Sequence, residues 1–115
     1  MGFFKNDRAK VTVISPQEAR KIMTQSDSAD NYVLLDVRTP LEYEQIRIAG
    51  ARLIPVDELE RRAPAELPDK NIPILVYCKS GMRALKAAET LVNMGYANVR
   101  SFGGILNWPY ETEPK

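Results

Sequence analysis

The chemistry of this sequence centres on its single cysteine, Cys78, which directly follows the apolar run 74–77. Lys79 and Arg83 place two cations beside this thiol. A loop between a strand's carboxyl end and a helix start turns unpaired N–H groups inward, and the helix adds partial positive charge. A thiol there ionises more easily than a free thiol of pKa ~8.5, and the thiolate is the nucleophile. The pattern predicts an anion cradle around a sulfur nucleophile.

Each of these residues also has a purely structural interpretation. A cysteine after a buried strand is often a small apolar core residue, and Lys79 and Arg83 could be solvated surface charges. The clustering of Cys, Lys, Ser, Gly and Arg favours the functional interpretation, because glycine supplies backbone conformations that other residues resist. Around Cys78 we expect an active-site loop made of Lys79, Ser80, Gly81, Met82 and Arg83.

The composition limits the available chemistry. The 115 residues include one cysteine and no histidine. These counts exclude an internal disulfide, histidine acid–base catalysis, Cys–His dyads and histidine metal sites. A single soft ligand does not hold zinc, so we expect no metal and no cofactor. Any chemistry must use a cysteine that is activated without a histidine.

The overall charge points to no macromolecular partner of opposite charge. Sixteen basic and fifteen acidic residues give a formal net charge of +1, so we expect no nucleic-acid partner. No apolar run approaches a membrane span, and the first residues do not resemble a secretory signal. We therefore expect no membrane partner and a cytoplasmic protein. It would form one domain over 1–115, with a lead-in at 1–9 and a polar tail at 111–115.

Strand and helix patterns alternate along the chain. Strands are predicted at 11–14, 32–35, 51–54, 72–77 and 99–102. Helices are predicted at 16–25, 40–46, 58–62 and 83–94, with a linking loop at 63–70, a turn at 103–104 and a helical turn from 105. Ser15 with Glu18, Thr39 with Glu42 and Asp57 with Glu60 have the spacing of capping boxes. The alternation predicts an α/β domain with a mainly parallel sheet of about five strands and helices on both faces. Such sheets place their sites beyond the carboxyl ends of strands, where Cys78 lies.

Four segments resemble those of a known family. Segment 36–43 reads D-V-R-T-P-L-E-Y, segment 48–55 reads I-A-G-A-R-L-I-P, segment 78–83 reads C-K-S-G-M-R, and Gly103-Gly104-Ile105 precedes Trp108. In this order and spacing they resemble the single-domain rhodanese-like sulfurtransferases, over almost the whole chain. The resemblance implies a three-layer rhodanese-like domain.

The sequence departs from the family pattern at two places. Arg47 stands where the family usually has histidine, and Thr112-Glu113 replaces a glycine before the terminal proline. We expect this position to be structural, with the Arg47 side chain facing solvent rather than contacting substrate. For Asp36 and Arg38 we favour a structural ion pair that ties the strand to a neighbouring loop over a role in lining the site.

The resemblance implies a ping-pong sulfur transfer with Cys78 as the catalytic residue. The Cys78 thiolate would take the outer sulfur of thiosulfate or a similar donor, sulfite would leave, and a Cys78 persulfide would remain. Lys79 and Arg83 would attract the anionic donor. Because the chain has no second cysteine, the acceptor must be external. Cyanide, a thiol, a dithiol or a protein thiol would serve.

Two other functions remain open at this point. A non-catalytic binding module could keep the same fold, although such modules often lose the cysteine. Cysteine phosphatases and arsenate reductases have related loops with five residues between Cys and Arg, whereas four lie between Cys78 and Arg83. The shorter loop suits a single sulfur atom better than a phosphate.

Overall fold

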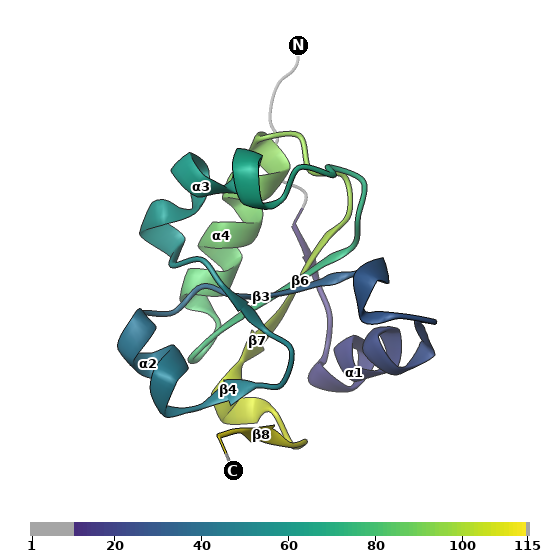
Figure 1. Ribbon diagram of the computed structural model, residues 1–115, viewed down its shortest axis with the longest axis vertical. Helices are drawn as coiled ribbons and strands as arrows, with labels where there is room; N and C mark the ends of the chain where they lie inside the picture. Colours follow the sequence, from purple (N-terminus) through teal and green to yellow (C-terminus); the bar gives the residue numbers. More distant parts are fainter. Residues whose placement is uncertain (1–10, 115) are drawn as a thin grey trace.

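The computed structural model describes residues 11–114, so the predicted lead-in lies outside the described residues. A five-stranded sheet forms its centre, and all of its strand pairs are parallel. The strand order is β2 (Thr12–Val13), β7 (Val99–Gly104), β6 (Ile74–Cys78), β3 (Val33–Asp36) and β5 (Arg52–Leu53). The predicted α/β class with a parallel five-stranded sheet is confirmed (Figure 1).

Helices cover both faces of the sheet. The helix α1 (Pro16–Gln25) packs on one face, and α3 (Leu59–Glu66) and α4 (Met82–Asn93) pack on the other (Figure 1). The short helix α2 (Pro40–Gln45) follows β3. The described residues also form short 3-10 helices, η1 (Ala29–Asn31), η2 (Val56–Glu58) and η3 (Ile105–Asn107). No described helix has the length and apolar content needed to cross a membrane.

The strand β6 shows how the two faces share the core. Ile74, Val76 and Cys78 belong to the cluster beneath α3 and α4. Leu75 and Tyr77 belong to the cluster beneath α1. Because successive side chains of a strand point to opposite faces, this alternation fixes the side to which the Cys78 thiol is directed.

Two of the three predicted capping boxes are confirmed. Ser15 Oγ accepts a hydrogen bond from Glu18 N at 3.0 Å, and Glu18 Oε1 accepts one from Ser15 N at 2.9 Å. Thr39 and Glu42 make the same reciprocal pair at the start of α2. Both boxes satisfy N–H groups that the first helical turn leaves without partners.

The third box and the loop after it are wrong predictions. Asp57 lies inside η2, and α3 begins at Leu59 and continues to Glu66. The predicted loop at 63–70 is therefore helical in its first part, with Pro64 inside the helix. Leu59, Ala63 and Leu67 are all buried at a spacing of four residues, and this packing outweighs the proline's local cost.

The C-terminal segments also differ from the prediction. Gly103 and Gly104 complete β7 rather than forming a turn. Part of the predicted tail forms β8 (Thr112–Glu113), which pairs antiparallel with β4 (Arg47–Ile48) in a separate two-stranded sheet. A pair of two-residue strands is too short to show a hydrophobic alternation in the sequence.

Candidate active site

Cys78 is the last residue of β6, and it is 1% exposed. Its Sγ accepts a hydrogen bond from the backbone N–H of Gly81 at 2.9 Å. Gly81 has a φ of +122° and precedes the first turn of α4. Only glycine adopts that conformation readily, so the residue type sets the direction of the amide that faces the sulfur. Within residues 11–114, this one amide bonds to the sulfur, fewer than the ring of amides expected from the sequence.

The end of β7 and the following turn η3 hold the active-site loop in place. The Lys79 carbonyl accepts a hydrogen bond from Leu106 N at 3.2 Å. A Cβ placed on Gly104 would lie 1.9 Å from Lys79 O, inside van der Waals contact. Gly104 is therefore required by the close approach of two backbones, and this contact fixes the loop on which Cys78 is presented.

Arg83 is bound by a carboxylate from another element. Its Nη1 donates to Glu42 Oε1 at 2.8 Å, and its Nη2 donates to Glu42 Oε2 at 3.0 Å. These hydrogen bonds are the main cause that lowers the pKa of Glu42 to about 2. The pair joins α2 to the first turn of α4. It also balances the Arg83 charge that the sequence pattern assigns to attracting a donor.

Glu42 is the site residue that sequence reasoning does not identify. The sequence marks it as part of a capping box and of the family segment 36–43, but not as the partner of Arg83. The two residues are 41 positions apart, so helix spacing gives no indication of their contact. The acidic residue within a family segment is the one signal that could have suggested a partner for the active-site arginine.

A buried polar network lies behind the loop. Asp36 and Arg38 are 0% and 2% exposed, and Arg38 Nη2 donates to Asp36 Oδ2 at 2.8 Å. The same Nη2 donates to the Ile46 carbonyl at 2.5 Å. Asp36 and Arg38 thus form the expected structural ion pair, which ties β3 to a neighbouring segment, but Arg38 also lines the cavity beside the cysteine loop, so the two interpretations do not exclude each other for this residue.

Tyr77 extends this network to β4. Its hydroxyl donates to Asp36 Oδ2 at 2.8 Å and accepts from Ile48 N at 3.1 Å. Burial, and after it the charge of Asp36, raises the pKa of Tyr77 far above its usual value. The hydroxyl therefore stays protonated and serves as a fixed hydrogen-bond donor.

Arg47 is only partly solvent-facing, which corrects the expected orientation of its side chain, whereas its contacts with Tyr43 and Glu113 agree with the expected structural role. Its Nη1 donates to the Tyr43 carbonyl at 3.1 Å, and its guanidinium lies 4.8 Å from the centre of the Tyr43 ring. Its Nε lies 3.6 Å from Glu113 Oε1. The side chain is 28% exposed and joins α2 to β8.

A cavity of about 160 Å³ lies beside the active-site loop. It is lined by Arg38, Glu42, Gln45, Ile46, Lys79, Ile105 and Leu106. Lys79 is exposed and has no ion-pair partner among the described residues. Ser80 and Met82 are also exposed. The structure thus brings Lys79 and Gly81 close to the cysteine and leaves Ser80 and Met82 on the surface.

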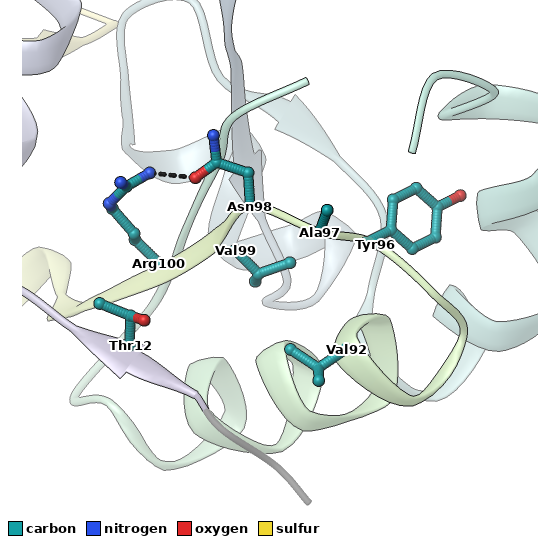
Figure 2. Close-up of a pocket in the computed structure, with 7 residues that line it drawn as sticks. All are labelled: Thr12, Val92, Tyr96, Ala97, Asn98, Val99 and Arg100. Carbon is teal, nitrogen blue, oxygen red and sulfur yellow. Dashed lines mark hydrogen bonds between the residues drawn. The ribbon is translucent and has the colours of Figure 1, made fainter. Parts of the chain in front are cut away.

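A larger cavity, of about 280 Å³, lies at the opposite end of the sheet (Figure 2). Thr12 and Val99 begin their strands there, and Val92 is near the end of α4. Asn98 Oδ1 accepts a hydrogen bond from Arg100 Nη1 in this cavity. Its lining includes no cysteine or carboxylate. This cavity therefore offers no thiol, although it is larger than the cavity lined by Lys79.

The site is suited to chemistry at a sulfur atom. It offers a thiol at a helix N-terminus, an amide N–H on that thiol, and one exposed lysine beside it. No histidine is present in the chain to act as a base. Among residues 11–114 there is no group of side chains that would hold a metal ion. The arrangement supports direct nucleophilic attack by sulfur.

Comparison with known proteins identifies the family. Residues 15–110 match the profile of the rhodanese-like domain. The thiosulfate sulfurtransferase PspE of Escherichia coli K12 is 41% identical over 71 residues, which are 62% of this chain and 68% of PspE. The probable adenylyltransferase/sulfurtransferase MoeZ of Mycobacterium tuberculosis is 34% identical over 108 residues. That match covers 92% of this chain but only 26% of MoeZ.

A solved structure shows the same fold. The human single-domain sulfurtransferase TSTD1 superposes with a TM-score of 0.74 at 26% identity, covering 86% of this chain and 96% of TSTD1. The match therefore covers most of both chains rather than one motif. Together with the profile match, it shows that this chain belongs to the rhodanese-like domain family.

Proposed function

We propose that this protein is a sulfurtransferase that carries a sulfane sulfur on Cys78. The observation that carries the proposal is the position of the Cys78 thiol at the end of β6, with the Gly81 N–H 2.9 Å from its sulfur. An amide N–H and the start of α4 both favour negative charge on that atom. Kinship with thiosulfate sulfurtransferases supports the same chemistry.

The first half-reaction loads the cysteine. The Cys78 thiolate attacks the outer sulfur of thiosulfate, a new S–S bond forms, and the bond between the two thiosulfate sulfurs breaks. Sulfite leaves with the electron pair of that bond, and Cys78 holds a persulfide anion. Charge and atoms balance without proton transfer, so the absence of histidine is no obstacle.

The second half-reaction removes the sulfur from Cys78. The thiolate of an external acceptor attacks the outer sulfur of the persulfide, and the bond to Cys78 Sγ breaks. The acceptor leaves as a persulfide, and the Cys78 thiolate is regenerated. Since the chain has one cysteine, no thiol within it competes for the sulfur.

The two cations beside the cysteine have different roles in this proposal. Lys79 is exposed and meets the anionic donor, because no described carboxylate pairs with it. Arg83 is bound to Glu42 through two hydrogen bonds, so its main effect is to position the first turn of α4. The donor role expected for both residues is therefore proposed for Lys79 alone.

Intact-mass spectrometry after exposure to thiosulfate tests the proposal. The wild-type protein is expected to gain the mass of one sulfur atom and to release one equivalent of sulfite. Cys78→Ser is expected to gain nothing, and Lys86→Ala is the control because Lys86 is exposed on α4 outside the active-site loop. An unmodified wild type, or a sulfur adduct that persists in Cys78→Ser, contradicts the assignment.

Hydrolysis of an aryl phosphate by the same preparations tests the phosphatase alternative. The four residues between Cys78 and Arg83 and the Arg83–Glu42 pair both disfavour a bound phosphate. We expect no turnover above the Cys78→Ser background. A binding module without activity would fail both assays.

A further inference from the structure

The cavity at the amino-terminal end of the sheet lies apart from the cysteine loop. Its volume is about 280 Å³, larger than that of the cavity lined by Lys79 (Figure 2). Val99 lines it and pairs with Ile74, which lies four residues before Cys78 along β6. At about 3.3 Å per strand residue, this separation is about 13 Å. A ligand in this cavity would therefore not occupy the position of a donor at the Cys78 sulfur.

Two polar side chains of this cavity are joined to each other. Arg100 Nη1 donates a hydrogen bond to Asn98 Oδ1 (Figure 2). Since the amide oxygen accepts this bond, the NH₂ group of Asn98 is left to donate, and a guanidinium can only donate. We call Asn98 and Arg100 the polar pair. The pair, with the nearby hydroxyl of Thr12, presents hydrogen-bond donors to the cavity.

The charge of Arg100 has no counterion in this cavity. None of the described residues that line it is acidic, and within the described part of the chain no carboxylate forms an ion pair with Arg100. Asn98 is neutral, so the bond between the two side chains leaves the charge uncompensated. Both are half-buried, where water screens a charge less than it does at an exposed side chain. The lining is therefore complementary to an anion.

The carboxyl end of α4 opposes an anion only in part. Val92, in the last turn of this helix, lines the cavity, and a helix end of this kind carries partial negative charge. Lys70 Nζ donates to the Met94 carbonyl at 2.8 Å and so places a cation at the same helix end. The full charge of Arg100 then determines the sign of the ligand.

The other side of the cavity is apolar. Figure 2 shows Val92 and Val99 on the α4 side of β7, away from the polar pair. The Tyr96 hydroxyl donates to the Leu67 carbonyl at 2.6 Å, so the ring rather than the hydroxyl is left to contact a ligand. Pockets for small molecules generally have about 300–1,000 Å³, so a cavity of about 280 Å³ suits a ligand of few atoms. The division into polar and apolar sides suits an amphipathic ligand.

We propose that this cavity binds a small organic carboxylate. Its carboxylate accepts hydrogen bonds from Arg100 and Asn98, because a planar guanidinium matches a carboxylate in geometry. Its carbon body contacts Val92, Val99 and the ring of Tyr96. An inorganic anion such as phosphate would use the polar pair but would leave the apolar side in water. This site is separate from the proposed sulfur transfer and does not depend on it.

Four small molecules serve as probes: isovalerate, isovaleramide, acetate and phosphate. Isovaleramide has the shape of isovalerate without its charge, and acetate has the charge with three fewer carbon atoms. Each is titrated into the ¹⁵N-labelled protein, and the backbone amide shifts are followed by NMR. We expect isovalerate to shift the amides of residues 96–100. Its Kd should be at least about tenfold lower than those of the other three, because each of them loses either a charge-assisted hydrogen bond or the burial of carbon atoms.

Two variants test the polar pair. Asn98→Asp keeps an oxygen for Arg100, but it replaces the NH₂ group with an oxygen and compensates the guanidinium charge. Arg100→Gln removes that charge. Both are expected to raise the Kd of isovalerate at least about tenfold and to abolish the preference for isovalerate over isovaleramide. Arg61→Gln is the matched control, because Arg61 is an exposed arginine on α3 that does not line the cavity, and it should keep the full preference.

The probe comparison on the wild type decides the proposal even if a variant does not fold. Equal affinities for isovalerate and isovaleramide, or no shift of the amides at 96–100, would overturn it. Phosphate that binds as tightly as isovalerate would make this a site for inorganic anions and would also overturn the assigned ligand class. Shifts confined to residues 78–83 would place the ligand at the cysteine loop and contradict a second site.

Discussion

Glu42 holds Arg83 through two hydrogen bonds, of 2.8 and 3.0 Å, across a sequence separation of 41 residues. The contact joins the helix after the D-V-R segment to the helix after the cysteine loop. It gives the active-site end of the sheet a fixed geometry. The Glu42 carboxylate also balances one of the two positive charges that the cysteine loop would otherwise present to a donor.

The pH dependence of the free energy of unfolding should report the contribution of the Glu42–Arg83 pair. The pKa of Glu42 is lowered from 4.5 to about 2, mainly by Arg83, so its contribution to stability is complete above pH 4.5 and is lost as the pH falls towards 2. We expect Glu42→Gln to lose stability at neutral pH, on the order of 1–2 kcal/mol, and to show a smaller further loss over that acid range. Chemical denaturation at pH 7, 4 and 3 measures both effects.

Glu18→Gln is the matched control for this experiment. Glu18 occupies the same capping-box position in α1 as Glu42 does in α2, but no described arginine pairs with it. Both variants therefore lose the capping contribution, and only Glu42→Gln also loses a contact with an arginine. An identical pH dependence for the two variants would show that the Arg83 contact does not contribute.

A double substitution should show whether Arg83 acts by pairing with the Glu42 carboxylate or by binding the donor directly. Arg83→Ala leaves the Glu42 carboxylate beside the cysteine loop without its partner, so we expect slower persulfide formation from thiosulfate. Arg83→Ala combined with Glu42→Gln removes that carboxylate charge and should recover part of the rate. Single-turnover loading measures both variants. If the double variant is as slow as Arg83→Ala, the guanidinium itself takes part in donor binding.

Gly104→Ala should displace the cysteine loop. The new Cβ would lie 1.9 Å from Lys79 O, and its three nearest neighbours are all backbone atoms, so a side-chain movement cannot relieve the clash. We expect a loss of about 3 kcal/mol or more in the free energy of unfolding, together with greatly reduced sulfur loading. Thermal unfolding and intact mass measure the two effects.

Gly50→Ala is the comparison for that substitution. Gly50 has a φ of +86°, and a Cβ placed on it would meet nothing within 4 Å, so its replacement tests backbone strain without a clash. Its expected cost is about 1–2 kcal/mol, with sulfur loading retained. Normal loading in Gly104→Ala would contradict the role of Gly104 in positioning the loop.

Local sequence patterns are sufficient for most of the fold. The sequence predicts buried strands at 32–35 and 72–77 and the reciprocal caps of α1 and α2, because these features depend on neighbouring residues. The structure has these strands at Val33–Asp36 and Ile74–Cys78. The end of α3 depends instead on the burial of Leu67 beyond Pro64, and β8 depends on pairing with β4. Those contacts join residues that no local periodicity connects.

The same distinction applies to the site. The sequence predicts Cys78 and the glycine whose amide faces it, because both lie in one short loop. It does not predict that Glu42 neutralises Arg83 or that Gly104 lies against Lys79, since each contact joins distant elements. The charge of the loop alone therefore overestimates the positive charge available to a donor.

Lys79→Ala tests whether the remaining cation serves the donor. Lys79 is exposed beside Cys78, and no carboxylate among residues 11–114 pairs with it. Removal of its charge should raise the KM for thiosulfate roughly fivefold and leave kcat nearly unchanged, because the attraction acts on a donor that is already fully charged before reaction. Raising the ionic strength should reduce the difference between variant and wild type. Lys86→Ala is the control, since Lys86 is an exposed lysine further along α4. A KM that is unchanged in Lys79→Ala, or raised equally in Lys86→Ala, would remove Lys79 from the donor site.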